Sequence, residues 1–481
     1  MPLLDGGDPI FTPIALPSGR TLRNRLVKVS LYEHLAKLLG GPPNRFHLEL
    51  YSKWSAHDWG MIFTGNVLVS PQHMCLARDL VLPSSLSDED LKPFEMLAAA
   101  IHGEREDRPM AIMQLSHAGR QSPNLLGGRF PFAAPLAPSS IRLGSSLKNN
   151  GLISDLLHRF IFQVPRAMSP ADIDDVVESF VRGVKVAART GYDGVELHAA
   201  HGYLLAQFIS AKSNTRTDEY SCSPSNALRL VHRIVLETRA AVPSEFILGL
   251  KINAADYADS SIAGEVSPAL DHIRTIASWG SVDFIEISGG DYEKPDFLTT
   301  DVSGVSARQA IFADFAQHAR RAVESVPRAP LILLTGGLTT PAQLHSALSG
   351  RHADLLGLGR SAILRPDLPR LLRDAPAPHA LFGSPPDLSV GGAWLFDRLP
   401  RIKLLGAGVA MAWYIVALRR LGTPSLAAMG PPYSVSAMGG ILWMWAWFGA
   451  DVDGARIYYA LPLALVCVAA GLALGWVPTW A

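Results

Sequence analysis

Two histidines and a tyrosine stand close together after a short apolar segment in the middle of the chain. The run GVEL at residues 194–197 leads into His198, His201 and Tyr203. Imidazole N–H groups can hold a substrate oxygen on which negative charge develops, and a phenol can donate or accept a proton. An isolated HxxH pair can equally consist of one surface histidine and one buried, hydrogen-bonded histidine. The spacing therefore predicts an oxygen-binding site only if the end of a strand brings the three side chains together.

Two glycine-containing segments, TGGL at 335–338 and GLGR at 357–360, are suited to hold a phosphate group. Glycine allows backbone N–H groups to come close to an anion, and an arginine can pair with it. Either segment on its own could also be a simple tight turn. The candidate phosphate ligands are Gly336, Gly337, Gly359 and Arg360.

Gln114 and Lys251 carry polar side chains at the ends of apolar runs, where a flat heteroaromatic ring could bind. The Gln114 amide offers a donor and an acceptor to the edge of a pyrimidine, and the Lys251 ammonium would stabilise an anionic ring. Lys251 could instead be paired with a buried acid or act as a Schiff-base amine. The opposite side of the ring would be lined by a small residue and by peptide groups, those of Gly65, Val27, Lys28 and Val29.

These residues need a scaffold that brings the ends of several strands to one place. Helical spacing of apolar residues is clearest over 171–189 and 226–241. Eight strand–helix units predict an α/β fold, the (β/α)8 TIM barrel, whose active sites lie at the carboxyl ends of the strands. A doubly wound Rossmann sheet fits less well, because no glycine follows the first strand. The predicted strands are 25–31, 61–67, 110–115, 194–198, 246–252, 283–288, 331–335 and 355–358.

Three regions follow one another along the chain: a barrel at 1–373, a Pro- and Ala-rich linker at 374–393, and an apolar tail at 394–481. The tail contains apolar runs at 404–418, 435–450 and 457–476. The last of these has twenty residues without charge, enough to span a hydrocarbon core. One expectation is a membrane anchor, and the other is a set of helices that pack on the barrel or form a homodimer contact. Within the barrel, a Pro-, Gly- and Ser-rich insertion at 121–165 predicts a lid or pocket wall.

The charge balance and the cysteines argue against several other classes of protein. The 481 residues include 43 basic and 43 acidic side chains, which give no field to attract nucleic acid. Three widely spaced cysteines predict neither a disulfide framework nor a metal site. The N-terminal segment lacks the basic and apolar parts of a secretory signal. We therefore expect a cytoplasmic location, with membrane anchoring only if 457–476 spans a bilayer.

Several motifs resemble those of the Old Yellow Enzyme family of flavin oxidoreductases and occur in the family's order. The resemblance covers about residues 8–373 and is strongest to fungal NADH:flavin oxidoreductases, which also end in a helix similar to GAGVAMAWY at 406–414. The motifs are RNRLVK at 23–28, FTGNV at 63–67, QLSHAGR at 114–120, HAAHGY at 198–203, SNTRTDEY at 213–220, TGG at 335–337 and GLGR at 357–360.

This resemblance implies a non-covalently bound FMN that is reduced by NAD(P)H. It also implies hydride transfer from flavin N5 to the β-carbon of a small α,β-unsaturated carbonyl substrate. The implied roles are ring contact for Gln114 and Lys251, phosphate binding for Gly337, Gly359 and Arg360, substrate-oxygen binding for His198 and His201, and proton delivery for Tyr203.

Three features depart from the family's pattern. Tyr32 stands where the family usually has a threonine or cysteine that hydrogen-bonds to the flavin, so its phenol could either donate there or narrow the pocket. The family's EYGGS-type turn reads EYSCS at 219–223, without the glycines that a positive φ favours. The apolar tail after Leu421 is outside the family's pattern.

Three alternative functions remain open at this point. The same site could isomerise a double bond without net reduction, with the flavin as a transient hydride store. A flavin-free barrel could act as an aldolase through a Schiff base on Lys251. A barrel without activity could serve as a membrane-tethered binding module.

Overall fold

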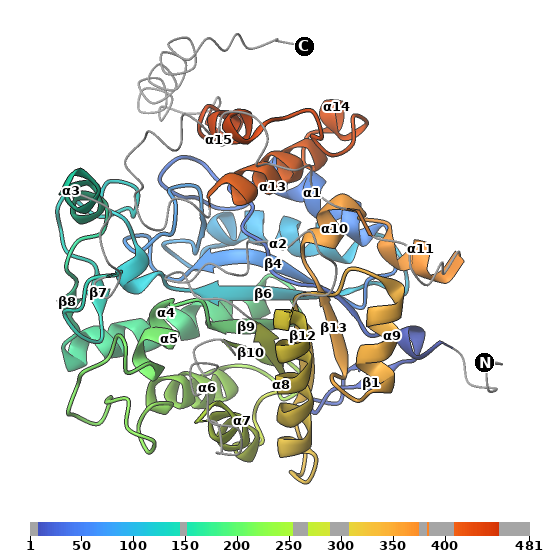
Figure 1. Ribbon diagram of the computed structural model, residues 1–481, viewed down its shortest axis with the longest axis horizontal. Helices are drawn as coiled ribbons and strands as arrows, with labels where there is room; N and C mark the ends of the chain where they lie inside the picture. Colours follow the sequence, from blue (N-terminus) through green and yellow to red (C-terminus); the bar gives the residue numbers. More distant parts are fainter. Residues whose placement is uncertain are drawn as a thin grey trace.

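Eight parallel strands form a closed barrel in the computed structural model, which describes residues 8–144, 152–253, 268–288, 307–374, 382–383 and 408–451. Each barrel strand pairs with the barrel strand that follows it in the chain, and the last pairs with the first. The predicted (β/α)8 barrel is confirmed, and all eight predicted strands overlap with observed ones (Figure 1). The barrel strands are β3 (Leu26–Lys28), β4 (Met61–Leu68), β6 (Met110–Ser116), β9 (Gly194–Ala199), β10 (Ile247–Asn253), β11 (Phe284–Ser288), β12 (Leu331–Thr335) and β13 (Leu355–Leu358).

Apolar side chains fill one end of the barrel. Every second residue of a strand points inward, and the inward residues near the strand starts include Ile112, Ile247 and Phe284, which are fully buried. A short antiparallel hairpin of β1 (Ile14–Ala15) and β2 (Thr21–Leu22) adds Leu22 to this cluster. The polar groups of the interior are therefore found toward the carboxyl ends of the strands.

Helices surround the barrel, and their ends follow from local sequence. In α4 (Pro170–Arg189), Ser169 and Asp172 form a capping box and Pro170 occupies the first turn. The predicted helix at 171–189 is confirmed, whereas the one at 226–241 begins later, in α6 (Arg229–Ala241). The other elements of the barrel region are η1 (Pro9–Phe11), α1 (Arg45–Ser55), β5 (Leu80–Val81), α2 (Asp88–His102), η2 (Gly119–Gln121), α5 (Leu204–Ile209), α7 (Pro268–Ser278), α8 (Ala307–Val323), α9 (Pro341–Ser349), α10 (Arg360–Leu364) and α11 (Leu368–Asp374).

The predicted insertion at 121–165 lies beside the carboxyl end of β9. Gln121 Nε2 donates to the carbonyl oxygen of His201 at 2.6 Å. The insertion contains β7 (Leu136–Ala137) and α3 (Leu152–Ile161), and β7 pairs in parallel with β8 (Arg166–Ala167). Figure 1 shows α3, β7 and β8 grouped at one edge of the molecule. The insertion thus forms part of the wall on the side of the barrel that carries the predicted site.

Two of the three apolar runs of the tail coincide with helices that pack on the barrel. α13 (Gly408–Leu421) lies against α1 and α10, and α15 (Ala437–Trp445) lies against α13, with α14 (Pro424–Ala427) between them in sequence (Figure 1). The indole N–H of the fully buried Trp413 donates to the Pro432 carbonyl at 3.0 Å. Among the described residues, no helix has the length and apolar character needed to cross a bilayer. The run at 457–476 and nearly all of the predicted linker lie outside the described residues.

Candidate active site

His198, His201 and Tyr203 lie together at the carboxyl end of β9. The ring centroids of His198 and His201 are 5.1 Å apart, and the ring of Tyr203 is 4.6 Å from that of His198, with interplanar angles of 72° and 85°. His201 has a φ of +54°, a left-handed conformation that few residues other than glycine adopt. The chain turns sharply at this point, so that Tyr203 caps α5 directly after the histidine pair.

Hydrogen bonds indicate which atoms of the two histidines can face a substrate. The backbone N–H of Ala200 donates to His198 Nδ1 at 3.3 Å, so a neutral His198 carries its hydrogen on Nε2. His201 Nε2 lies 3.0 Å from Ser288 Oγ at the end of β11. Burial lowers the pKa of both imidazoles well below the usual value, and the nearby charge of Lys251 lowers it further. Both rings are therefore uncharged hydrogen-bonding groups at neutral pH.

The hydroxyl of Tyr203 lies between β4 and β9. Asn66 Nδ2 donates to it at 3.3 Å, and the Cys75 thiol is a second polar neighbour. The aromatic ring packs in an apolar cluster with Leu68 and Met74. Asn66 belongs to the FTGNV motif but was not predicted as a site residue; its only sequence signal is an amide within a mostly apolar strand.

A layer of four buried polar side chains lies in the barrel interior near the histidines. Gln114, Glu196, Lys251 and Glu286 come from β6, β9, β10 and β11, and none is more than 4% exposed. Gln114 Nε2 donates to Glu196 Oε2 at 2.6 Å, and Ser30 Oγ donates to Gln114 Oε1 at 2.7 Å. Lys251 Nζ lies 2.8 Å from Glu286 Oε1. The amide and the ammonium that the sequence indicates for ring binding therefore share one buried network.

The two glutamates of this layer were not predicted, and they change the interpretation of Lys251. Each lies at an inward position of an apolar strand, in GVEL and FIEI, and this position is the only sequence signal. The ion pair with Glu286 matches the alternative in which Lys251 is paired with a buried acid. Because a Schiff base requires a neutral amine, the ion pair argues against the aldolase alternative.

The two glycine loops lie side by side at the ends of β12 and β13, which pair in parallel. Gly336 and Gly337 have φ of +114° and +72°, and a Cβ atom added to Gly336 would meet no atom within 4 Å. Successive N–H groups in such a turn form a concave site for an anion. Arg360 follows Gly359 at the start of α10. Open backbone donors beside a guanidinium fit the phosphate of FMN, and the Gln114 and Lys251 side chains fit its ring.

The Lys28 side chain points outward from the barrel, away from its interior. The side chain that lies beside Gly65 is on the same outer side of β3 and β4. Lys28 Nζ donates to the Phe63 carbonyl at 2.7 Å and lies 4.2 Å from the ring centroid of Trp54 in α1. A Cβ atom on Gly65 would come within 2.3 Å of Glu33 Oε2, so this glycine allows the Glu33 side chain to pass. The Lys28 ammonium therefore faces away from the ring site, and the peptide groups at 27–29 and the small Gly65 stay the predicted contacts of the ring.

Tyr32 joins the cluster around Tyr203 to the C-terminal helices. Its ring packs against both the apolar cluster that contains Tyr203 and a second cluster that includes Ile415 of α13 and Met444 of α15. Its hydroxyl faces the buried Asp79 carboxyl and opposes the rise that burial causes in the pKa of that group. Tyr32 therefore contacts both α13, whose first part resembles the family's C-terminal helix, and α15, which lies beyond the family's pattern.

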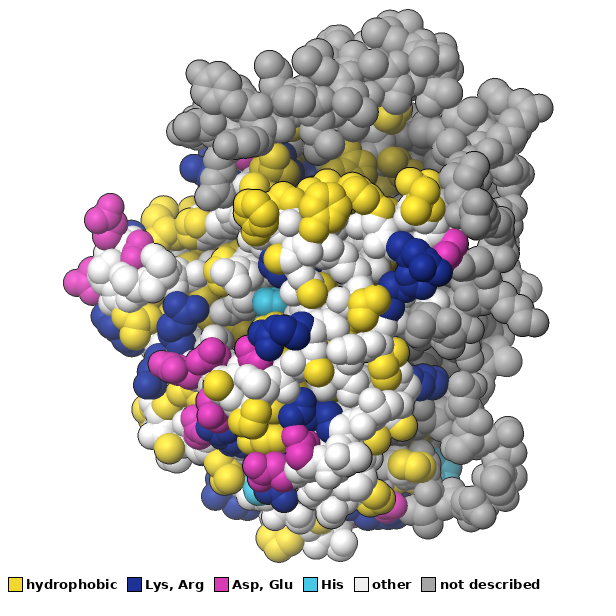
Figure 2. All heavy atoms as spheres, turned by 90° about the vertical axis from the view of Figure 1, so that its left-hand side faces the viewer, with side chains coloured by type: hydrophobic (Ala, Val, Ile, Leu, Met, Phe, Trp, Pro, Cys, Tyr) yellow, Lys and Arg dark blue, Asp and Glu magenta, His cyan; other side chains and the backbone are white. Residues whose placement is uncertain are grey.

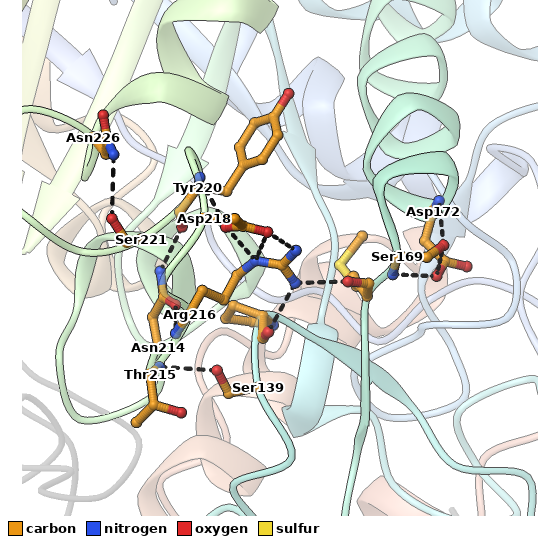
Figure 3. Close-up of polar contacts among 12 residues, drawn as sticks. Ser139, Ser169, Asp172, Asn214, Thr215, Arg216, Asp218, Tyr220, Ser221 and Asn226 are labelled. Atoms are coloured by element: carbon orange, nitrogen blue, oxygen red, sulfur yellow. Dashed lines mark hydrogen bonds and ion pairs between the residues drawn. The ribbon is translucent and has the colours of Figure 1, made fainter.

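The SNTRTDEY motif at 213–220 forms hydrogen bonds that hold neighbouring segments together (Figure 3). Arg216 donates to the carbonyl oxygens of Pro138 at 3.2 Å and Met168 at 2.6 Å and pairs with Asp218. These bonds connect the loop after β9 to β7 and to the segment before α4. None of residues 221–223 has a positive φ, so the loss of the family's glycines causes no backbone strain here.

On the face shown in Figure 2, acidic and basic side chains are interspersed. In the part of the chain that the structure describes, no group of histidine, cysteine or acidic side chains could hold a metal ion.

Comparison with solved structures supports the barrel fold. An Old Yellow Enzyme homologue from Zymomonas mobilis aligns with a TM-score of 0.59 and 22% identity over 76% of this chain and 93% of that chain. A 2-naphthoyl-CoA reductase in complex with 2-naphthoyl-CoA aligns with a TM-score of 0.62 and 20% identity, over 76% of this chain and 52% of that one.

Sequence comparison identifies the family. The chain is 38% identical over 367 residues to the NADH-dependent flavin oxidoreductase iliE of Neonectria sp. (strain DH2). The aligned residues make up 74% of this chain but only 46% of that longer protein. It is 33% identical to the NADH-dependent flavin oxidoreductase iccE of Talaromyces variabilis, over 85% of this chain and 97% of that one. Residues 9–375 match the family described as the NADH:flavin oxidoreductase / NADH oxidase family. The chain therefore belongs to this family of Old Yellow Enzyme-type oxidoreductases, which use FMN as the cofactor and NAD(P)H as the reductant.

Proposed function

We propose that the protein reduces the activated C=C bond of a small α,β-unsaturated carbonyl compound, with NAD(P)H as the reductant and FMN as the bound cofactor. The observation that carries this proposal is the arrangement of His198, His201 and Tyr203 at the end of β9. It combines two uncharged imidazoles with a phenol, above a buried layer that contains an amide and an ammonium group.

The two imidazoles would bind the carbonyl oxygen of the substrate. A neutral His198 presents its hydrogen on Nε2, and His201 would offer a second ring N–H from a ring whose centroid lies 5.1 Å away. As the C=C bond is reduced, negative charge moves onto the carbonyl oxygen, and fixed N–H donors in a buried site stabilise it. Both rings are neutral, and His198 is buried while His201 is half-buried, so neither needs to lose a proton and His198 has no hydration shell to lose when the substrate binds.

Tyr203 would donate the proton that the α-carbon requires. Its ring lies edge-on to His198, so a carbonyl held by the histidines would place the adjacent carbon atoms near the phenol. Asn66 donates to the phenolic oxygen, which stabilises the negative charge that remains after the proton has left. Tyr203 and Asn66 thus act together, one as the donor and the other as its support.

The cofactor would be held by two groups of residues at neighbouring strand ends. Gln114 and Lys251 would contact the ring, and the phosphate would lie on the loops after β12 and β13. When bound, FMN supplies the hydride at N5 for the β-carbon of the substrate. The phosphate ligands would be Gly336, Gly337, Gly359 and Arg360.

An absorbance experiment on the purified full-length chain tests this proposal. We expect flavin bands that NADH or NADPH bleaches without oxygen, and that cyclohex-2-enone then restores with one cyclohexanone formed per NAD(P)H consumed. A chain that binds FMN and is reduced, but is not reoxidised by any activated alkene, would contradict the proposal.

The same experiment separates the alternatives. Isomerisation at the flavin site would shift a double bond without net consumption of NAD(P)H. A chain that binds no flavin but is trapped covalently at Lys251 by borohydride with an aldehyde would be an aldolase. Flavin bands that NAD(P)H does not bleach would indicate a binding module.

A further inference from the structure

Glu196 and Glu286 place two carboxyl groups against each other inside the barrel. They occupy inward positions of β9 and β11, on either side of β10, and both are fully buried. The two side chains lie within hydrogen-bonding reach of one another. Among the described residues, no donor hydrogen-bonds to Glu196 Oε1 or Glu286 Oε2. Two ionised carboxylates in contact would repel each other, since neither brings a hydrogen to the contact.

We propose that Glu196 is a protonated positioning residue. It shares one proton with Glu286 and fixes the Gln114 side chain by accepting a hydrogen bond from its amide nitrogen. The proton completes a continuous chain of contacts from Ser30, just after β3, through side chains of four strands. Ser30 donates to Gln114, and Gln114 donates to Glu196 Oε2 at 2.6 Å. The hydrogen on Glu196 Oε1 is donated to Glu286, and Glu286 is paired with Lys251 at 2.8 Å. Every polar group of the layer then has a partner.

The surrounding charges assign the proton to Glu196 and the negative charge to Glu286. Lys251 Nζ contacts Glu286 directly, and this contact stabilises the ionised form of that carboxyl. Burial and the neighbouring Glu286 raise the pKa of Glu196 well above its usual range, against smaller opposing effects of Lys251 and Gln114. Among the residues that the structure describes, the other titratable groups that face this layer are the imidazoles of His198 and His201, both neutral at pH 7. Apolar residues of the barrel floor lie on the opposite side.

The consequence of this arrangement is a fixed orientation of the Gln114 amide. Its oxygen faces Ser30 on the β3 side, and its nitrogen faces Glu196 on the β9 side. One N–H and one lone pair of the amide remain for the edge of the cofactor ring. Because Glu196 is neutral, the layer holds one positive and one negative charge, and the Lys251 ammonium stays balanced beneath the ring. The inference rests on the proposed function only for the position of that ring.

Two neutral isosteres distinguish the protonated carboxyl from the ionised one. In Glu196→Gln, the new amide can accept from Gln114 and donate to Glu286, so it reproduces both contacts of the protonated acid. We expect its thermal unfolding midpoint and its dissociation constant for FMN to match the wild type within about twofold. Glu286→Gln leaves a buried lysine without a counter-ion and should lower the unfolding midpoint by roughly 5 °C or more.

Infrared spectroscopy checks the protonation of Glu196, and a double variant checks its separation from the Glu286–Lys251 ion pair. The wild-type minus Glu196→Gln spectrum of the full-length protein at pH 7 should contain the C=O band of one protonated carboxylic acid. If Glu286→Gln accumulates poorly, Glu286→Gln combined with Lys251→Met removes both charges and should recover most of the lost stability. The proposal would be overturned if both isosteres lowered the unfolding midpoint equally, or if Glu196→Gln alone lowered it. The absence of the carboxylic acid band would also overturn it.

Glu196→Ala tests the support of Gln114 separately from catalysis. Loss of the acceptor beneath the amide should weaken FMN binding by about tenfold, and Glu196→Gln should restore it. Wild-type FMN affinity in Glu196→Ala would exclude a positioning role. These measurements follow cofactor binding, stability and a vibrational band, so a failure to reduce enones leaves their outcome unaffected.

Discussion

Arg78 and Asp451 form a buried ion pair that fastens the end of the C-terminal helical segment to the loop before β5. The guanidinium Nη2 lies 2.6 Å from Asp451 Oδ2, and the two side chains are 2% and 0% exposed. Asp451 Oδ1 also accepts a hydrogen bond from the backbone N–H of Leu38 at 2.8 Å. In the same region Arg419 of α13 donates to His34 Nδ1 at 2.7 Å. These contacts make the helices an integral part of the wall that holds Tyr32.

We expect Asp451→Ala to lower the free energy of unfolding by roughly 3–5 kcal/mol, because it leaves the buried Arg78 without a counter-ion. Urea unfolding followed by circular dichroism measures the change. The exposed pair Lys92–Glu95 is a matched control, and Glu95→Ala should cost less than about 1 kcal/mol. Equal effects of the two variants would mean that the C-terminal segment contributes no buried electrostatic contact.

The histidine pair should be required for turnover but not for cofactor binding. We expect His198→Ala and His201→Ala each to lower the turnover of an enone roughly 10²–10³-fold, as for the loss of one oxyanion donor. FMN content should stay near that of the wild type. The control is His318→Ala, at an exposed histidine on α8, and it should change neither the turnover nor the FMN content. Wild-type turnover in both variants would show that another group binds the substrate oxygen.

The barrel could be predicted from sequence because parallel strands that are buried on both faces consist of nearly continuous apolar runs. Runs such as MIFTGNVL in β4 and ILGLKIN in β10 are apolar for most of their length and continuously buried. The start of α6 was predicted too early because residues 226–228 have helical composition but form a turn, with Arg229 as the first helical residue. The packing of α13 and α15 could not be decided, since an apolar run has the same composition on a barrel and in a bilayer.

The candidate site could be predicted in part, because its residues follow strand ends. His198, Gln114 and Lys251 stand out as polar residues at such positions, and the structure brings them together. Glu196 and Glu286 could not be predicted to interact, since they are ninety residues apart in sequence and meet only when β10 lies between their strands. The peptide group of Lys28 stays a predicted ring contact, whereas the direction of its side chain depends on strand register, and its ammonium points toward α1.

Tyr203→Phe should separate the two half-reactions. The phenyl ring keeps the edge-on contact with His198 but loses the hydroxyl that Asn66 supports. We expect flavin reduction by NAD(P)H to be unchanged and reoxidation by an enone to slow roughly 10²-fold, as for the loss of a general acid. Stopped-flow absorbance measures both rates, with the exposed Tyr433→Phe as control. Equal slowing of both half-reactions would point to a structural role, and an unchanged second half-reaction would mean that another group supplies the proton.

Asp79 should make the stability of the fold depend on pH in the weakly acidic range. Burial raises the pKa of its carboxyl from 3.8 to about 6, although hydrogen bonds from the backbone N–H groups of Leu76 and Cys75 oppose this. A carboxyl with a raised pKa stabilises the fold fully below its ordinary pKa, and this stability is lost as the pH rises through about 6. Asp79→Asn keeps a neutral acceptor at all pH values. Between pH 4 and pH 7 the unfolding free energy of the wild type should therefore fall by roughly 3 kcal/mol relative to the variant. Urea unfolding of both chains across this range measures the difference, with the exposed Asp88→Asn as control. Parallel curves would show that Asp79 has an ordinary pKa in the folded protein.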